Sequence, residues 1–143
     1  MRYAVLLLPL LAGLAACETS SPKDKSAESA KPPRGVSLSG TASYRERIAL
    51  PADARLAVEI RDVSLMDAPA PLIAKVDIPT AGRQPPLAFT LDYDAARIVP
   101  RNRYAVSARI TDGTGRLIWI TDTHVDLPPV GQNVDLNLVR VAG

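Results

Sequence analysis

Few residues of this chain can carry covalent or metal chemistry. The sequence holds one cysteine, Cys17, and one histidine, His124, among 143 residues. Asp122 and Asp126 flank the histidine at a spacing of two, so in a strand all three side chains lie on one side. Such a trio resembles a divalent-cation site, but acidic pairs are far commoner as ordinary strand-surface residues. We therefore predict no metal site.

A catalytic constellation is equally hard to assemble from these residues. A serine hydrolase would have to use His124, and no GxSxG nucleophile signature occurs. Asp92 and Asp94 share a strand face as two glycosidase carboxylates would, yet no aromatic sugar platform accompanies them. No glycine-rich phosphate loop is present. We predict no enzymatic activity and no cofactor. The alternative is an enzyme or ligand carrier that acts on glycans of the cell envelope.

The context of Cys17 indicates a different chemistry. Arg2 precedes an apolar run over residues 3–16, which is shorter than the roughly 20 residues that span a bilayer. The run has the layout of a secretory signal peptide. Its end, Leu14-Ala15-Ala16-Cys17, resembles the lipobox of bacterial lipoproteins, in which a diacylglycerol joins the thiol before cleavage between Ala16 and Cys17. The alternative is a plain signal peptide with an incidental cysteine.

Lipidation of Cys17 predicts anchoring in a membrane by acyl chains such as palmitate. At about 0.8 kcal/mol per buried CH₂, one chain anchors marginally and two or three hold firmly. Residue 18 is Glu, not the Asp that resembles an inner-membrane retention signal, so we expect the periplasmic face of the outer membrane. Residues 18–35 have no large apolar side chain, which predicts a disordered tether.

From residue 36 onward, apolar side chains recur with a period of two. This alternation predicts half-buried antiparallel strands over residues 36–44, 56–61, 74–78, 87–94, 104–111 and 134–138. The stretch TDGTGR (111–116) has the Asp-Gly chemistry of a tight hairpin. Asp94 to Arg97 has the composition of a single capped helical turn. We divide the chain into a signal peptide (1–16), a lipidated cysteine with its tether (17–35) and a β domain (36–143).

About seven short strands separated by turns predict an all-β fold. We expect an antiparallel β-sandwich of immunoglobulin-like type, with a small barrel as the alternative. Tyr104 opens a strand after a loop and resembles the tyrosine corner of such sandwiches, although a buried core tyrosine explains it equally well. With 47% apolar and 4% aromatic residues, the core must be mostly aliphatic.

The stretch LIWITDTHVDL (117–127) departs from simple alternation, because its first half is apolar on both faces. Ile118 and Ile120 share one face, and Trp119 lies on the other. Such a strand is either covered on both sides or displays a patch for a partner. We therefore mark Ile118, Trp119 and Ile120 as candidate partner-binding residues.

The charge balance excludes one class of partner. The chain carries 17 basic and 15 acidic residues, a net charge of +2, and these residues are spread along its length. It has no basic tract and no patch of interleaved aromatic and basic side chains. We predict no binding to nucleic acid.

Three segments resemble the YbaY-like lipoproteins, which are grouped with the YscW-like type III secretion lipoprotein chaperones, or pilotins. They are GTASYRERIALPADARLAVEIRDVSLMDAPA (40–70), PLAFTLDYDAARIVPRNRYAVSARI (86–110) and GRLIWITDTHVDL (115–127). The resemblance runs from about residue 40 to residue 138. Its shorter motifs are Tyr44-Arg45-Glu46-Arg47, Leu50-Pro51, Asp62-Val63-Ser64, Asp67-Ala68-Pro69 and Trp119.

The resemblance implies a lipid-anchored β-sandwich in the bacterial envelope. For the pilotin branch it also implies a client: a secretin subunit held by its C-terminal segment and escorted to the outer membrane. The alternative is a housekeeping or structural envelope lipoprotein without a secretin client. Asp62, Ser64 and Asp67 also have a simpler interpretation, as turn residues that bond nearby backbone N–H groups.

Overall fold

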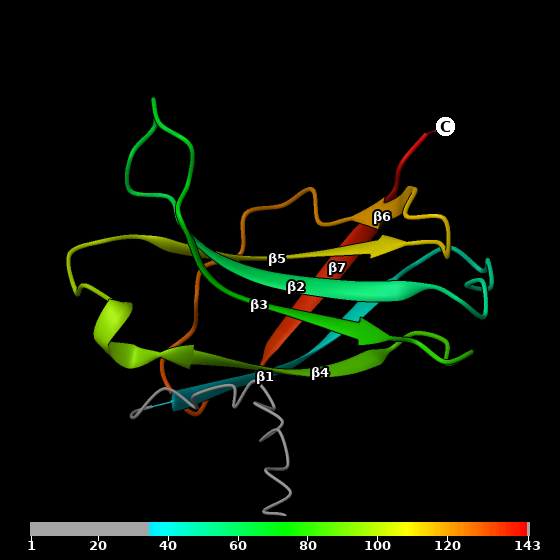
Figure 1. Ribbon diagram of the computed structural model, residues 1–143, viewed down its shortest axis with the longest axis horizontal. Helices are drawn as coiled ribbons and strands as arrows, with labels where there is room; N and C mark the ends of the chain where they lie inside the picture. Colours follow the sequence, from blue (N-terminus) through cyan, green and yellow to red (C-terminus); the bar gives the residue numbers. More distant parts are fainter. Residues whose placement is uncertain (1–34, 143) are drawn as a thin grey trace, which may run out of the picture. The chain divides into compact units, whose positions relative to one another are not determined.

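The computed structural model describes residues 35–142, and Figure 1 shows their arrangement. The predicted signal peptide, Cys17 and nearly all of the predicted tether lie outside the described residues. No helix among residues 35–142 is long and apolar enough to cross a membrane. The elements are β1 (Gly35–Tyr44), β2 (Arg55–Asp62), β3 (Leu72–Pro79), β4 (Leu87–Asp94), the 3₁₀ turn η1 (Ala95–Arg97), β5 (Tyr104–Thr111), β6 (Leu117–Ile120) and β7 (Val134–Arg140).

The seven strands form a single sheet in the order β3-β2-β5-β6-β7-β1-β4. Its end strands, β3 and β4, come into contact, although no hydrogen-bonded ladder joins them within the described chain. The sheet therefore curls until it nearly closes into a barrel (Figure 1). The all-β fold of seven strands is confirmed, whereas the immunoglobulin-like sandwich is not.

One pairing differs from the expected antiparallel pattern. Strands β1 and β7 are parallel, with Gly40 opposite Val134 and Tyr44 opposite Leu138. The other neighbouring strands are antiparallel. Alternation along a strand reports which face is buried but not which strand lies beside it, so the expectation that every pair is antiparallel was wrong here.

Strand β6 is shorter than the predicted run over 117–127. The hydroxyl of Thr121 accepts a hydrogen bond from the Ala108 amide at 2.6 Å, at the place where the ladder with β5 ends. The chain then leaves the sheet and returns to the start of β5, where the Leu127 amide donates to the Tyr104 carbonyl at 2.9 Å. The polar residues between these points lie in an outward loop.

The strand that is covered on both faces is β2. Leu56, Val58 and Ile60 point into the aliphatic core, at 1% exposure or less. Ala57 and Glu59 point outward, yet they are also buried. The doubly covered strand is therefore β2, for which it was not predicted, whereas β6, in the 117–127 stretch, has only its inner face fully buried.

Candidate functional site

Strand β6 separates the three candidate partner-binding residues onto two faces. Trp119 lies opposite the buried Ile110 of β5 and is 3% exposed. Its ring stacks on Tyr44 with centroids 3.7 Å apart and planes 7° from parallel. Trp119 is therefore a core residue, and a partner could reach it only if the core opened.

Ile118 and Ile120 lie on the outer face of the same strand, where both are half-buried. Ile120 is paired with Arg109 on β5 and with Val139 on β7, so the three side chains form a row across the outer face. Val139 is 38% exposed. We call Ile118, Ile120 and Val139 the β6–β7 patch. Sequence reasoning missed Val139, because the alternation that marks β7 assigns it to the solvent face without naming its neighbours.

Arg109, which pairs with Ile120, forms a cationic border to the β6–β7 patch, and Glu59 holds it together with Arg61 and Lys75 from β2 and β3. This carboxylate is 4% exposed and receives Arg61 Nε at 2.8 Å, an Arg109 guanidinium nitrogen at 3.3 Å and Lys75 Nζ at 3.9 Å. The three cations keep 38–44% of their side chains exposed. Asp77, 3.1 Å from Lys75, is a second carboxylate of this cluster, so three cations and two carboxylates leave a net positive charge that favours anionic side chains.

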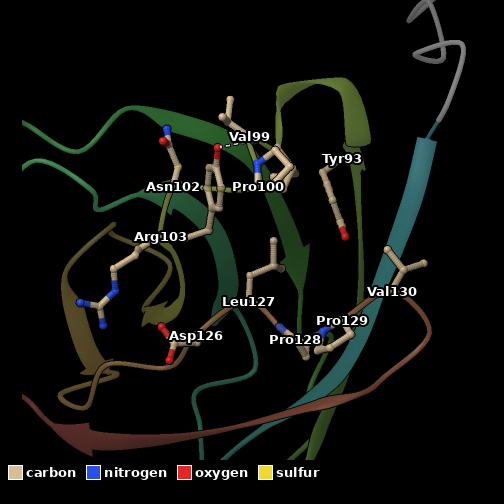
Figure 2. Close-up of a pocket in the computed structure, with 12 residues that line it drawn as sticks. Tyr93, Val99, Pro100, Asn102, Arg103, Asp126, Leu127, Pro128, Pro129 and Val130 are labelled. Atoms are coloured by element: carbon tan, nitrogen blue, oxygen red, sulfur yellow. Dashed lines mark hydrogen bonds between the residues drawn. The ribbon is translucent and has the colours of Figure 1, made fainter.

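A second apolar surface lies at the end of the barrel where β4 stops and β5 begins. It is a groove of about 400 Å³, in which Val99 and Pro100 on one side face Leu127, Pro128 and Pro129 on the other (Figure 2). Its volume falls in the range of small-molecule pockets. Its rim carries Val99 at 43% exposure and Val130 at 71%.

The wall of this end groove is fixed by Tyr104. Its hydroxyl accepts a hydrogen bond from the Val99 amide at 2.9 Å and donates to the Arg97 carbonyl at 3.2 Å. This bonding to backbone just upstream is what a tyrosine corner does. Sequence reasoning did not find the groove, because its lining comes from two distant loops whose adjacency no local pattern records.

The candidate carboxylates Asp94, Asp122 and Asp126 make hydrogen bonds to residues close to them in the sequence. His124 Nε2 lies 2.8 Å from Asp126 Oδ1, but Asp122 accepts from the Thr123 hydroxyl instead. In the part of the chain that the structure describes, no three His, Cys, Asp or Glu side chains gather as metal ligands. Asp94 accepts from the Ala96 amide at 2.9 Å and caps η1, as expected.

Residues 33–138 match the family model of the type III secretion system lipoprotein chaperone YscW. The chain belongs to the YscW family. The match covers every strand of the sheet almost to the end of β7, including the β6 residues described above. The similarity to this family therefore lies in the β domain.

Two individual proteins resemble this chain closely. The uncharacterized lipoprotein YbaY of Escherichia coli K12 is 41% identical over 108 residues, which are 73% of this chain and 55% of that protein. This chain thus spans about half the length of that relative. The structure of an alternative pilotin from the type II secretion system of Vibrio cholerae is 46% identical, with a TM-score of 0.72. That match covers 77% of this chain and 100% of the pilotin.

Proposed function

We propose that this member of the YscW family is a non-enzymatic envelope lipoprotein that binds a secretin subunit and escorts it, as a pilotin does. The observation that carries the proposal is the match to the alternative pilotin, at 46% identity over that protein's whole length. Identity at this level over a complete domain supports a shared type of partner as well as a shared fold.

The anchor in this proposal is Cys17. Acyl chains on its sulfur, added before cleavage after Ala16, hold the mature protein on the periplasmic face of the outer membrane. The similarity to a lipoprotein of Escherichia coli supports this step. Residues 18–35 then link the anchor to the β domain.

The client binds at the β6–β7 patch in this proposal. Ile120 and Val139 offer neighbouring apolar side chains, and Arg109 lies directly beside Ile120 across the β5–β6 pairing. A client segment that alternates apolar and acidic side chains would satisfy both parts of this surface. Ile118, the third member of the patch, packs in part against the core, and the buried Trp119 supports the strand from below.

The test is affinity capture of the acylated protein from envelope extracts, followed by mass spectrometry. We expect a secretin to be enriched, and its binding to fall about tenfold or more in Ile120→Asp or Ile118→Asp, since a charge replaces an apolar contact. Ile48→Asp is the matched control, because Ile48 is 43% exposed and lies outside the patch. Secretin binding that is unchanged in both Ile118→Asp and Ile120→Asp would show that this surface is not the binding site.

A housekeeping lipoprotein without a secretin client is the second candidate. The 41% identity to the uncharacterized lipoprotein YbaY favours it. Capture of no secretin, with the protein still retained in the membrane through Cys17, would select this candidate.

A further inference from the structure

The loop between β2 and β3 displays two adjacent apolar side chains. Met66 is 97% exposed and Leu65 is 66% exposed. Figure 1 shows this loop projecting beyond the sheet. Asp67 is the single charged residue between residues 63 and 71. The capture proposal above makes no use of this loop.

Hydrogen bonds hold the base of the loop, while its tip is exposed to solvent. Asp62 accepts from the Ser64 amide at 2.9 Å and from Asn102 Nδ2 at 2.7 Å. The Ser64 hydroxyl oxygen accepts from the Arg103 amide at 2.9 Å, and the Val63 amide donates to the Arg103 carbonyl at 2.8 Å. These bonds tie the loop to the segment before β5 and leave the tip without cover.

The far side of the loop is tied down in the same way. Arg61 donates to the Ala70 carbonyl at 3.0 Å, and the Asp62 amide donates to the Pro71 carbonyl at 3.0 Å. Pro69 and Pro71 have no N–H group that needs a partner. The remaining backbone amides of the tip and the Asp67 carboxylate need hydrogen-bond partners, which the headgroup region of a bilayer supplies and its hydrocarbon core does not.

The chemistry and size of this tip fit a lipid surface. Leu65 and Met66 supply apolar area, but two side chains fall far short of the roughly 800 Å² per partner of a stable protein interface. A membrane surface requires no such area when an anchor already holds the protein beside it, because tethering raises the effective concentration.

The start of the β domain lies at the same end of the strands. Gly35 pairs with Asp94 at the end of β4, and Asp62 pairs with Tyr104 at the start of β5. Other exposed apolar side chains lie at this end, namely Leu72, Val99 and Val130. The 18 residues from 18 to 35 reach at most about 60 Å. This length exceeds the roughly 33 Å of the longest strand, so the loop can reach the membrane that holds Cys17.

We infer that Leu65 and Met66 insert into the headgroup region of the membrane that holds the anchor, as a second contact beside the acyl chains. The inference rests on the anchor at Cys17 in the proposed function. It needs neither a secretin nor the β6–β7 patch. The loop thereby limits the orientations of the domain on the membrane, which the anchor alone leaves free.

The experiment places a fluorophore at the tip. Acylated Met66→Trp protein is reconstituted into vesicles of phosphatidylethanolamine and phosphatidylglycerol containing dibrominated phosphatidylcholine. Ile48→Trp is the matched control, since Ile48 is exposed but follows the opposite end of β1. Unsubstituted protein gives the background from the buried Trp119.

We expect brominated lipid to quench the added emission of Met66→Trp at least about twofold, because apolar side chains that bury about 5–10 Å into the headgroup/acyl boundary come close to the brominated acyl chains. The added emission of Ile48→Trp should stay unchanged. Equal quenching at the two positions overturns the inference while leaving the anchor and the secretin client intact. Failure of the protein to float with vesicles overturns the anchor, and the inference with it.

Discussion

At the scale of single residues, Glu59 is the buried charge on which three partly exposed cations converge. Glu59→Gln keeps the shape and removes the charge, which leaves Arg61 and Arg109 without this carboxylate and Lys75 with Asp77 alone. We expect the free energy of unfolding to fall by about 1–3 kcal/mol, less than for a fully buried pair because water screens the cations.

Denaturant titration of the purified domain measures this loss. Asp77→Asn is the control, because Asp77 is 44% exposed and contacts only Lys75 among the described ion pairs. It should change stability by no more than about 0.5 kcal/mol. Equal effects from the two substitutions would mean that Glu59 does not organise this surface.

Gly40 is the residue of β1 at which the chain has no room for a side chain. An added Cβ would overlap the Val134 carbonyl oxygen and lie 2.8 Å from Phe89 Cζ. Both neighbours belong to strands that pair with β1, so neither moves freely. Gly40→Ala should therefore destabilise the fold by about 1–3 kcal/mol or more, as overpacking does.

Thermal unfolding tests the prediction for Gly40. Ser39→Ala, one position along on the outer face, is the comparison and should shift the midpoint little. A Gly40→Ala protein as stable as Ser39→Ala would show that β1 and β7 lie further apart than described.

Residue types predicted part of the candidate site, whose role in binding stays a prediction. Ile118 and Ile120 stand out in the sequence because apolar residues occupy both faces of one strand. Val139 and Arg109 become their neighbours only through pairing between strands distant in sequence. Local pattern carries no information on such pairing, so the patch was predicted in part and its cationic border was not.

At the scale of elements, two turns are fixed by carboxylates whose pKa values lie below the ordinary range. Hydrogen bonds from Ser64 lower the pKa of Asp62, and hydrogen bonds from Thr114 and Arg116 lower that of Asp112. A lowered folded-state pKa means that the unfolded chain binds protons first as pH falls. Their contribution is complete above the ordinary aspartate pKa and is lost as pH drops through the lowered values.

Hydrogen exchange between pH 5 and pH 2 follows this loss at the two turns. We expect protection of the Ser64 and Thr114 amides to decrease below about pH 4, the ordinary aspartate pKa, while a core amide such as that of Val58 is affected later. Asp62→Ala should remove the pH dependence at Ser64 alone. Protection at Ser64 that is unchanged by this substitution would contradict the role given to Asp62.

Strand positions were predicted from sequence to within a few residues, because half-buried strands alternate so regularly. The end of β6 was not, since Asp122, His124 and Asp126 continue the period of two while the chain has already left the ladder. The parallel pairing of β1 with β7 was also missed. It depends on where the 121–133 segment returns, which composition does not record.

At the scale of the whole molecule, one atom is proposed to decide location. Cys17→Ser removes the sulfur that accepts lipid, so the protein should move from the membrane fraction to the soluble periplasmic fraction. Fractionation with immunoblotting measures this, and Ser20→Ala is a control that spares the thiol. Membrane retention of Cys17→Ser would show that another contact suffices.

The most direct test of the proposed function measures where the secretin is located in the cell. In cells that lack this protein, the share of secretin multimers recovered in the outer membrane is measured by sucrose-gradient fractionation. We predict that the unsubstituted protein and Ile48→Asp restore this share, whereas Cys17→Ser and Ile120→Asp do not. Secretin that reaches the outer membrane equally well without the protein would contradict the pilotin account.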